Sequence, residues 1–175
     1  VDRDGAYFET SPNYGLHTRS LYLTFAEPLL NYRGSVFPDG LNLYDDPKFE
    51  SFLLLPQMST VCVGQAAPFG DMAPAVTQRP PPYHPPAVTD CTYTERLTTR
   101  LTDPAKRARY AALLKELESR DPKAAGRATE WRAFHWPDPP PSGDVALTDG
   151  MKRFLNGSFF YGQKGLAVLR RGEGA

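Results

Sequence analysis

Large apolar residues near the start of the chain recur at helical spacing. Three of them fall at positions i, i+7 and i+11 and so share one helical face: Tyr14, Leu21 and Phe25. Ser11 directly before Pro12 is typical of a helix start, because serine caps the free N–H groups and proline needs no donor at the first helical position. The pattern predicts a helix over about 12–32 that ends near Gly34. Pro28, which can kink a helix, lies close to its end.

The same start signal recurs as an aspartate directly before a proline. It occurs at Asp46-Pro47, Asp103-Pro104 and Asp121-Pro122. These pairs predict helices over 47–56, 104–120 and 122–134, the first of them interrupted by Pro56. The side chains expected to be buried on these helices are Phe49, Phe52 and Leu53, then Ala108, Ala112, Leu113 and Leu117, then Trp131 and Phe134.

Proline clusters interrupt the helical part of the chain and mark its end. The stretch 66–90 contains five prolines within a few residues of one another, which no helix can pass through, and it predicts a long extended loop. A second cluster, at 137–141, marks a boundary. Beyond it, 158–161 and 166–170 are rich in aromatic and aliphatic residues around a glycine-bounded turn, which predicts two strands. Helices followed by strands suggest two layers or two domains, divided here as 1–141 and 142–175.

Composition and charge narrow the classes of function only slightly. The chain has 20 basic and 20 acidic residues, so its net charge indicates no nucleic-acid partner and no attraction to a membrane surface. Prolines (18) and glycines (14) are abundant, but 12% of the residues are aromatic, and aromatic residues are scarce in disordered chains. An ordered domain with long loops is therefore expected.

The sequence offers few signals of compartment or cofactor. It contains no apolar run near the ~20 residues that span a bilayer, and the opening residues do not form a signal peptide. Because the chain does not begin with Met, we expect it to be part of a longer protein. Cys62 and Cys91 fit either a disulfide or two free thiols. The three histidines are too far apart in sequence to predict a metal site, and no cofactor is expected.

Three segments, in chain order, are similar to elements of one enzyme family. Residues 4–14, which begin Asp-Gly and end in Tyr14, match the pattern D-G-x-x-x-E-x-S-x-x-Y. Residues 68–71 (Pro-Phe-Gly-Asp) are similar to a P-x-F/I-G-D element, and residues 161–170 to a strand pair that ends in G-x-x-x-L/V-R. Together they resemble the heparinase II/III-like polysaccharide lyases. The first segment is fairly specific, whereas the other two gain weight only from their order and spacing.

The resemblance implies a fold and an activity. The fold is mainly α: part of an incomplete (α/α) toroid, followed by the first strands of an antiparallel β-sandwich. The activity is cleavage of a uronic-acid-containing polysaccharide, of heparan sulfate or alginate type, by β-elimination. The implied partners are this acidic polysaccharide and the remaining parts of the parent chain, and the implied location is periplasmic or secreted. The Asn or His that neutralises the uronate carboxylate, and a further catalytic His, would lie outside this sequence, so we expect the chain alone to be inactive.

The resemblance also suggests site residues. Tyr14 aligns with the family's tyrosine and is expected to protonate the leaving oxygen, since a phenol is normally protonated (pKa ~10). His17 lies one helical turn away and is a candidate proton partner. The family often has a histidine directly after the tyrosine, where this chain has Gly15. Glu9, Arg19 and Asp71 are candidates for substrate contact. Packing roles are the alternatives: the helix face for Tyr14, an ion pair with Arg19 for Glu9, and a turn for Asp71.

Two other functions remain open at this point. A glycoside hydrolase on an (α/α) barrel would need two opposed carboxylates, and the sequence marks out no such pair. A non-catalytic carbohydrate-binding module could keep the fold without the chemistry, because a fold does not fix a function. In such a module Tyr7, Tyr14, Trp131 and Trp136 would be platforms for sugar rings or core residues.

Overall fold

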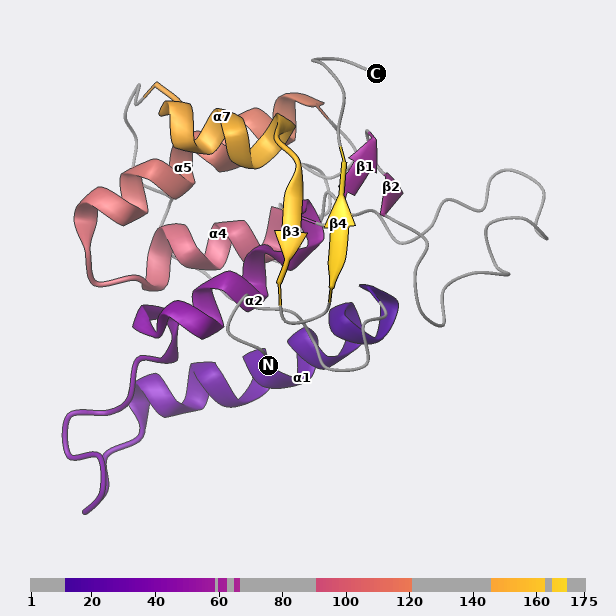
Figure 1. Ribbon diagram of the computed structural model, residues 1–175. Helices are drawn as coiled ribbons and strands as arrows, with labels where there is room; N and C mark the ends of the chain where they lie inside the picture. The colour runs from indigo at the N-terminus through magenta and orange to yellow at the C-terminus, as the bar shows by residue number, and fades with distance from the viewer. Residues whose placement is uncertain are drawn as a thin grey trace.

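A computed structural model of the protein describes residues 12–58, 60–62, 65–66, 91–120, 146–162 and 165–169. These residues are mainly helical, as expected (Figure 1). The helices are α1 (Pro12–Asn31), α2 (Pro47–Met58), α4 (Cys91–Arg100), α5 (Pro104–Arg120) and α7 (Asp149–Asn156), with a short 3-10 turn η1 (Leu43–Asp45). The strands form two antiparallel hairpins: β1 (Thr60–Cys62) with β2 (Gln65–Ala66), and β3 (Phe159–Tyr161) with β4 (Leu166–Val168).

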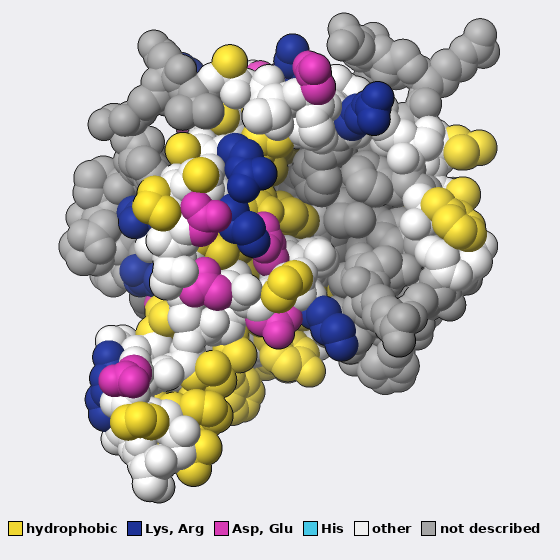
Figure 2. Space-filling model, turned by 60° about the vertical axis from the view of Figure 1, so that its left-hand side comes forward, with side chains coloured by type: hydrophobic (Ala, Val, Ile, Leu, Met, Phe, Trp, Pro, Cys, Tyr) yellow, Lys and Arg dark blue, Asp and Glu magenta, His cyan; other side chains and the backbone are white. Residues whose placement is uncertain are grey.

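Helix α1 has the expected bounds, but it buries a different face. Leu21 and Phe25 are 51% and 66% exposed. The buried side carries Arg19, Leu23 and Ala26 instead, at the same helical spacing. Because this stripe includes an arginine and an alanine, hydrophobicity alone points to the wrong face. The space-filling view shows hydrophobic side chains gathered low on one side of the molecule, over the end of α1 (Figure 2).

Helix α2 does not stop at Pro56, contrary to the sequence prediction. It continues to Met58. A proline inside a helix has no N–H for the carbonyl four residues earlier, which here belongs to Phe52. That carbonyl accepts a hydrogen bond from Arg19 Nη1 of α1 instead, at 3.1 Å. A donor from the neighbouring helix therefore replaces the one that proline lacks, so the helix can pass through this position.

The aspartate caps occur where the Asp-Pro pairs predict them. Asp46 Oδ1 accepts from the N–H groups of Lys48 (2.8 Å) and Phe49 (3.1 Å) at the start of α2. Asp103 Oδ1 does the same at the start of α5, at 2.8 and 3.3 Å from the next two donors. Helix α5 runs over 104–120 as predicted. The predicted helix over 122–134, the Ser11 cap and nearly all of the predicted loop lie outside the described residues.

Helix α2 lies between α1 and the α4–α5 hairpin, and α7 also contacts it (Figure 1). The core forms along these contacts. Phe52 and Leu53 of α2 are fully buried, as the sequence predicts. The core cluster consists of Leu23, Ala26, Tyr44, Leu53, Leu54, Tyr93, Leu97, Leu101, Leu113, Leu114 and Leu117. At ~1.5–3 kcal/mol for each large buried side chain, this cluster is the main source of stability in the described fold.

Helices α4 and α7 are not predicted by the sequence pattern. Helix α4 contributes Tyr93 and Leu97 to the core, but it also buries Thr94, Glu95, Arg96 and Thr98, so polar residues break up the apolar pattern that marks a helix. Helix α7 has eight residues and is capped by Thr148, whose Oγ1 accepts from Met151 N at 3.3 Å. Such a short segment gives too few turns for periodicity to reveal it.

The two predicted strands near the end of the chain are present. Strands β3 and β4 pair antiparallel, with Phe159 opposite Val168 and Tyr161 opposite Leu166. Gly165 in the connecting turn has φ +63°, a conformation that glycine adopts without strain. The small β1–β2 hairpin is not predicted by the sequence pattern.

Candidate functional site

A cavity of about 230 Å³ lies where α2, α5 and the start of α7 meet. Its apolar lining comes from Leu54, Leu113 and Met151. Its polar lining comes from Glu50 of α2, from Lys106, Arg109 and Tyr110 of α5, and from Thr148 before α7. Gly150 of α7 also lines it. This combination of an apolar lining and a few convergent polar groups is typical of small-molecule sites.

Glu50 is the acidic residue in this lining, and it is held by two donors. Lys106 Nζ lies 2.7 Å from Glu50 Oε2, and the Tyr110 hydroxyl donates to Glu50 Oε1 in a short hydrogen bond. The Glu50 side chain is largely buried and that of Lys106 is partly exposed. Both carboxylate oxygens already accept a hydrogen bond from within the protein. Glu50 is thus not free to take a proton from a ligand, and the arrangement suits binding better than acid–base chemistry.

Tyr110 is locked in its protonated form. Burial raises the pKa of Tyr110 above its usual value, and the hydrogen bond to Glu50 and the charge of Glu50 raise it further, while Arg109 lowers it. The hydroxyl therefore remains a donor to Glu50 at neutral pH.

Arg109 is the second cation at the cavity. Its Nε donates to Ala105 O of the same helix at 3.3 Å, and among the described residues it forms no ion pair. Because Lys106 and Glu50 neutralise each other, Arg109 leaves the described lining with a net positive charge. The guanidinium is thus positioned to receive an anion from solvent.

The first turn of α7 forms the opposite wall. Gly150 is exposed, and a Cβ added there would meet only Thr148 Oγ1, at 3.8 Å. A ligand can therefore approach this backbone closely. Asp149, which precedes Gly150, pairs at 3.8 Å with Lys152 on the surface, and its side chain is almost fully exposed.

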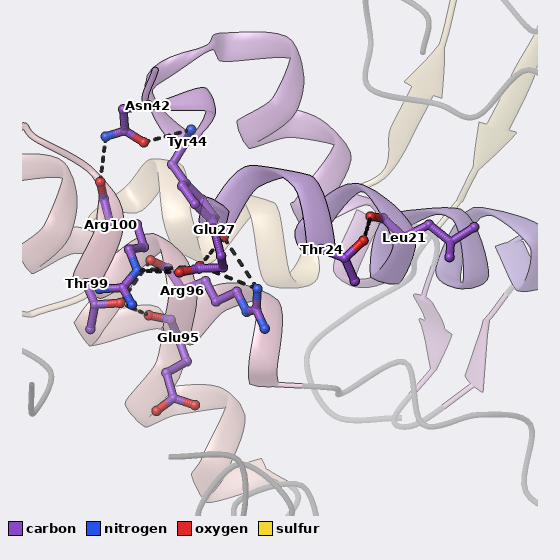
Figure 3. A network of polar contacts seen from close by, with 9 residues as sticks. All are labelled: Leu21, Thr24, Glu27, Asn42, Tyr44, Glu95, Arg96, Thr99 and Arg100. Atoms are coloured by element: carbon purple, nitrogen blue, oxygen red, sulfur yellow. Dashed lines mark hydrogen bonds and ion pairs between the residues drawn. The ribbon is translucent and has the colours of Figure 1, made fainter. Parts of the chain in front are cut away.

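A second polar cluster joins α1, η1 and α4 (Figure 3). Tyr44 donates from its hydroxyl to Glu27 Oε1 at 2.6 Å. Arg96 and Arg100 of α4 both point toward this carboxylate, with Arg96 Nη1 3.5 Å from Oε1 and Arg100 Nε 3.2 Å from Oε2. Burial, followed by the hydrogen bond to Glu27, raises the pKa of Tyr44 above its usual value.

This cluster continues into the turn between α4 and α5. Asn42 Nδ2 donates to Arg100 O at 2.8 Å, while Asp45 accepts from both the N–H and the hydroxyl of Thr102 at 3.0 Å. Asn42 Oδ1 also caps η1 through Tyr44 N. Apart from that cap, these bonds tie one element to another, so the cluster is a structural joint.

The structure describes some of the residues expected to form the catalytic site. Tyr14 and His17 both belong to α1, three positions apart, and their side chains lie outside the described part of the structure. Glu9 and Asp71 also lie outside the described residues. The roles of these four residues therefore remain predictions.

Arg19 is not available for the substrate contact expected of it. Its exposed fraction is 0%, and its guanidinium lies 5.5 Å from the ring centroid of Phe52 and 5.6 Å from that of Tyr93. With its hydrogen bond to Phe52 O, these contacts place the charge inside the core between α1, α2 and α4. Arg19 is buried there because Pro56 leaves the Phe52 carbonyl without a backbone donor, and that carbonyl needs a donor from outside its own helix. Arg19 is a structural residue in this fold.

The cavity residues are not found by sequence reasoning alone. Lys106, Arg109 and Tyr110 occur at i, i+3 and i+4 on the predicted helix over 104–120, so a shared face was visible in the sequence. Glu50 and the start of α7 are brought to that face only by tertiary packing. The described residues contain no group of three His, Cys, Asp or Glu side chains suited to a metal ion. Within the same residues, no helix is long and apolar enough to cross a membrane.

Comparisons with protein-family models, with curated proteins and with solved structures found no match to this chain.

Proposed function

We propose that the chain is part of a heparinase II/III-like polysaccharide lyase that cleaves a uronic-acid-containing polysaccharide by β-elimination. The observation that carries the proposal is the signature over 4–14, with Asp4-Gly5, Glu9, Ser11 and Tyr14 in register. The helical character of the described residues supports it, because the family's toroid is built from helices. The toroid, the β-sandwich, the secreted location and the acidic polysaccharide partner belong to this proposal.

The chemistry explains why a tyrosine is needed. Removing the proton at C5 of a uronate builds negative charge on the adjacent carboxylate, and the bond to O4 breaks as the double bond forms. A base must accept the C5 proton, and a donor must protonate the departing O4. A neutral phenol with pKa ~10 is suited to that step at neutral pH. Tyr14 is the proposed donor, with His17, one helical turn further along, as its proton partner.

The neutralisation of the carboxylate requires a further group. In the family an Asn or a His takes this role, aimed at the charge that develops in the transition state. This chain contributes the proton donor in our proposal, and other parts of the parent protein contribute the neutralising group. Arg19 is excluded from this role by its burial.

The test uses the parent protein that contains this sequence. Wild type and Tyr14→Phe are incubated with heparan sulfate, alginate and hyaluronan, and the unsaturated uronate product is followed by its ultraviolet absorbance. We expect turnover on one of these polymers and a loss of at least ~100-fold in Tyr14→Phe, the scale of a general acid. Tyr22→Phe, on the same helix, is the matched control and keeps full activity. New reducing ends without the unsaturated product would point to a hydrolase, and binding without any product would point to a non-catalytic module.

A further inference from the structure

We infer that the cavity between α2, α5 and α7 is a binding site for a small carboxylate, with Arg109 as the anchor for its charge. The inference rests on the described cavity alone and does not depend on the lyase proposal. It assigns a ligand class to residues that are not part of the signature over 4–14.

Charge identifies the class of ligand. The described lining holds two cations and one carboxylate, and the carboxylate is fully engaged by Lys106 and Tyr110. The remaining charge is that of Arg109, whose Nε bonds its own helix. A guanidinium presents a planar set of donors that matches a carboxylate in two parallel hydrogen bonds. A singly charged acid therefore neutralises the site.

Size limits the ligand to one small molecule. A volume of about 230 Å³ is below the ~300–1,000 Å³ of sites for drug-sized ligands. One sugar acid or a smaller organic acid is of suitable size. The apolar lining by Leu54, Leu113 and Met151 favours a ligand with a carbon skeleton over a bare inorganic anion.

Tyr110 and Lys106 keep the Glu50 carboxylate away from the space that a ligand would occupy. Without them the Glu50 carboxylate would repel an incoming anion and attract Arg109. Their two hydrogen bonds hold Glu50 on the α2 side of the cavity. At the wall formed by the first turn of α7 there is room for a ligand, because Gly150 presents no side chain there.

The experiment is a titration of the full chain, followed by the backbone amide signals in NMR. The probes are D-glucuronate, D-glucose and acetate. Glucuronate and glucose share the ring and differ in the carboxylate, so we expect saturable shifts at Gly150, Met151 and Arg109 with glucuronate and none with glucose. Equal responses to glucose and glucuronate, or no saturable shift with either acid, would overturn the inference. Acetate separates the two sources of a carboxylate: shifts at the same amides indicate small acids in general, and their absence indicates a sugar acid.

Three variants locate the site. Arg109→Gln should weaken glucuronate binding by at least ~10-fold, because a hydrogen-bonded charge is lost. Gly150→Leu should abolish binding by filling the cavity, while the α7 helix gains a better helix former. Arg153→Gln removes an exposed arginine of α7 outside the lining and should leave the affinity unchanged. Unchanged affinity in both Arg109→Gln and Gly150→Leu would contradict the assignment.

Discussion

Two tyrosine–glutamate pairs in the described part of this protein share a hydrogen bond of the same kind but differ in how the neighbouring cations are engaged. At the joint between α1 and α4, Tyr44 donates to Glu27, and two arginines of α4 converge on the same carboxylate. At the cavity, Tyr110 donates to Glu50, and Lys106 pairs with it, but the second cation, Arg109, forms no ion pair among the described residues. The first cluster closes a contact between helices. The second leaves one charge facing a cavity.

The difference shows how the same polar chemistry can support a fold or a site. A carboxylate that engages every nearby cation stabilises the packing around it and offers nothing to a ligand. A carboxylate that pairs with only one of two nearby cations stabilises the wall of the cavity and leaves the other cation able to bind a ligand. Removing a group from the closed cluster should therefore lower stability, whereas removing Arg109 should change binding alone.

The largest effect on the free energy of unfolding is expected at Arg19, a buried charge that, like the closed cluster, links two helices. Arg19→Met should lower the free energy of unfolding by about 3 kcal/mol, because Phe52 O loses its donor and buried contacts to two rings are lost. Urea unfolding measures this loss. Pro56→Ala supplies an N–H for the same carbonyl. Adding it to Arg19→Met should therefore raise the free energy of unfolding by about 1 kcal/mol more than adding it to wild type does. Additive effects of the two changes would contradict this explanation of how α2 passes through Pro56.

The two glutamates should differ in the same measurement. Glu27→Gln should cost about 2 kcal/mol, because two guanidinium groups lose their carboxylate. Glu50→Gln should cost about 1 kcal/mol, because one partly exposed lysine loses its carboxylate while Tyr110 can still donate to the side-chain oxygen. Asp149→Asn, which alters only a surface pair, is the control and should lie within ~0.5 kcal/mol of wild type. A greater loss of unfolding free energy for Glu50→Gln than for Glu27→Gln would contradict the distinction between the two clusters.

Both tyrosines should make the fold sensitive to alkali. The folded state raises the pKa of Tyr44 and of Tyr110, whereas in the unfolded chain a tyrosine titrates near ~10. Above that pH the unfolded state binds fewer protons than the folded state, so stability falls as the pH rises. Each tyrosine should contribute up to ~1.4 kcal/mol per pH unit above ~10. Tyr44→Phe and Tyr110→Phe should each reduce this slope in unfolding curves recorded at neutral and alkaline pH; an unchanged slope in both would argue against the buried hydrogen bonds.

Much of the helical framework is visible in the sequence because its signals are local. Asp46 and Asp103 before prolines mark the starts of α2 and α5, and their carboxylates form the predicted caps. The β3–β4 pair is predicted by two short apolar segments around Gly165. Each of these features depends on residues a few positions apart.

The features that the sequence does not reveal depend on distant partners. Helix α2 continues past Pro56 where Arg19, 33 positions away in sequence, donates to the Phe52 carbonyl. Helix α4 buries polar residues, and Arg96 and Arg100 on it meet Glu27 about 70 positions earlier. The cavity needs α7, which is too short to predict, to pack beside α5. Local patterns specify helices, but they do not specify which charge each helix will meet.

The most direct test of the distinction between the closed and the open cluster is the melting temperature of Arg109→Gln and wild type, each with and without D-glucuronate. Without ligand, the two proteins should melt at nearly the same temperature, because among the described residues the Arg109 side chain bonds only its own helix. With saturating ligand, wild type should melt at a higher temperature, since binding to the folded state alone stabilises it, and Arg109→Gln should show little or no rise. An equal rise in both proteins, or a variant that melts well below wild type without ligand, would contradict the account.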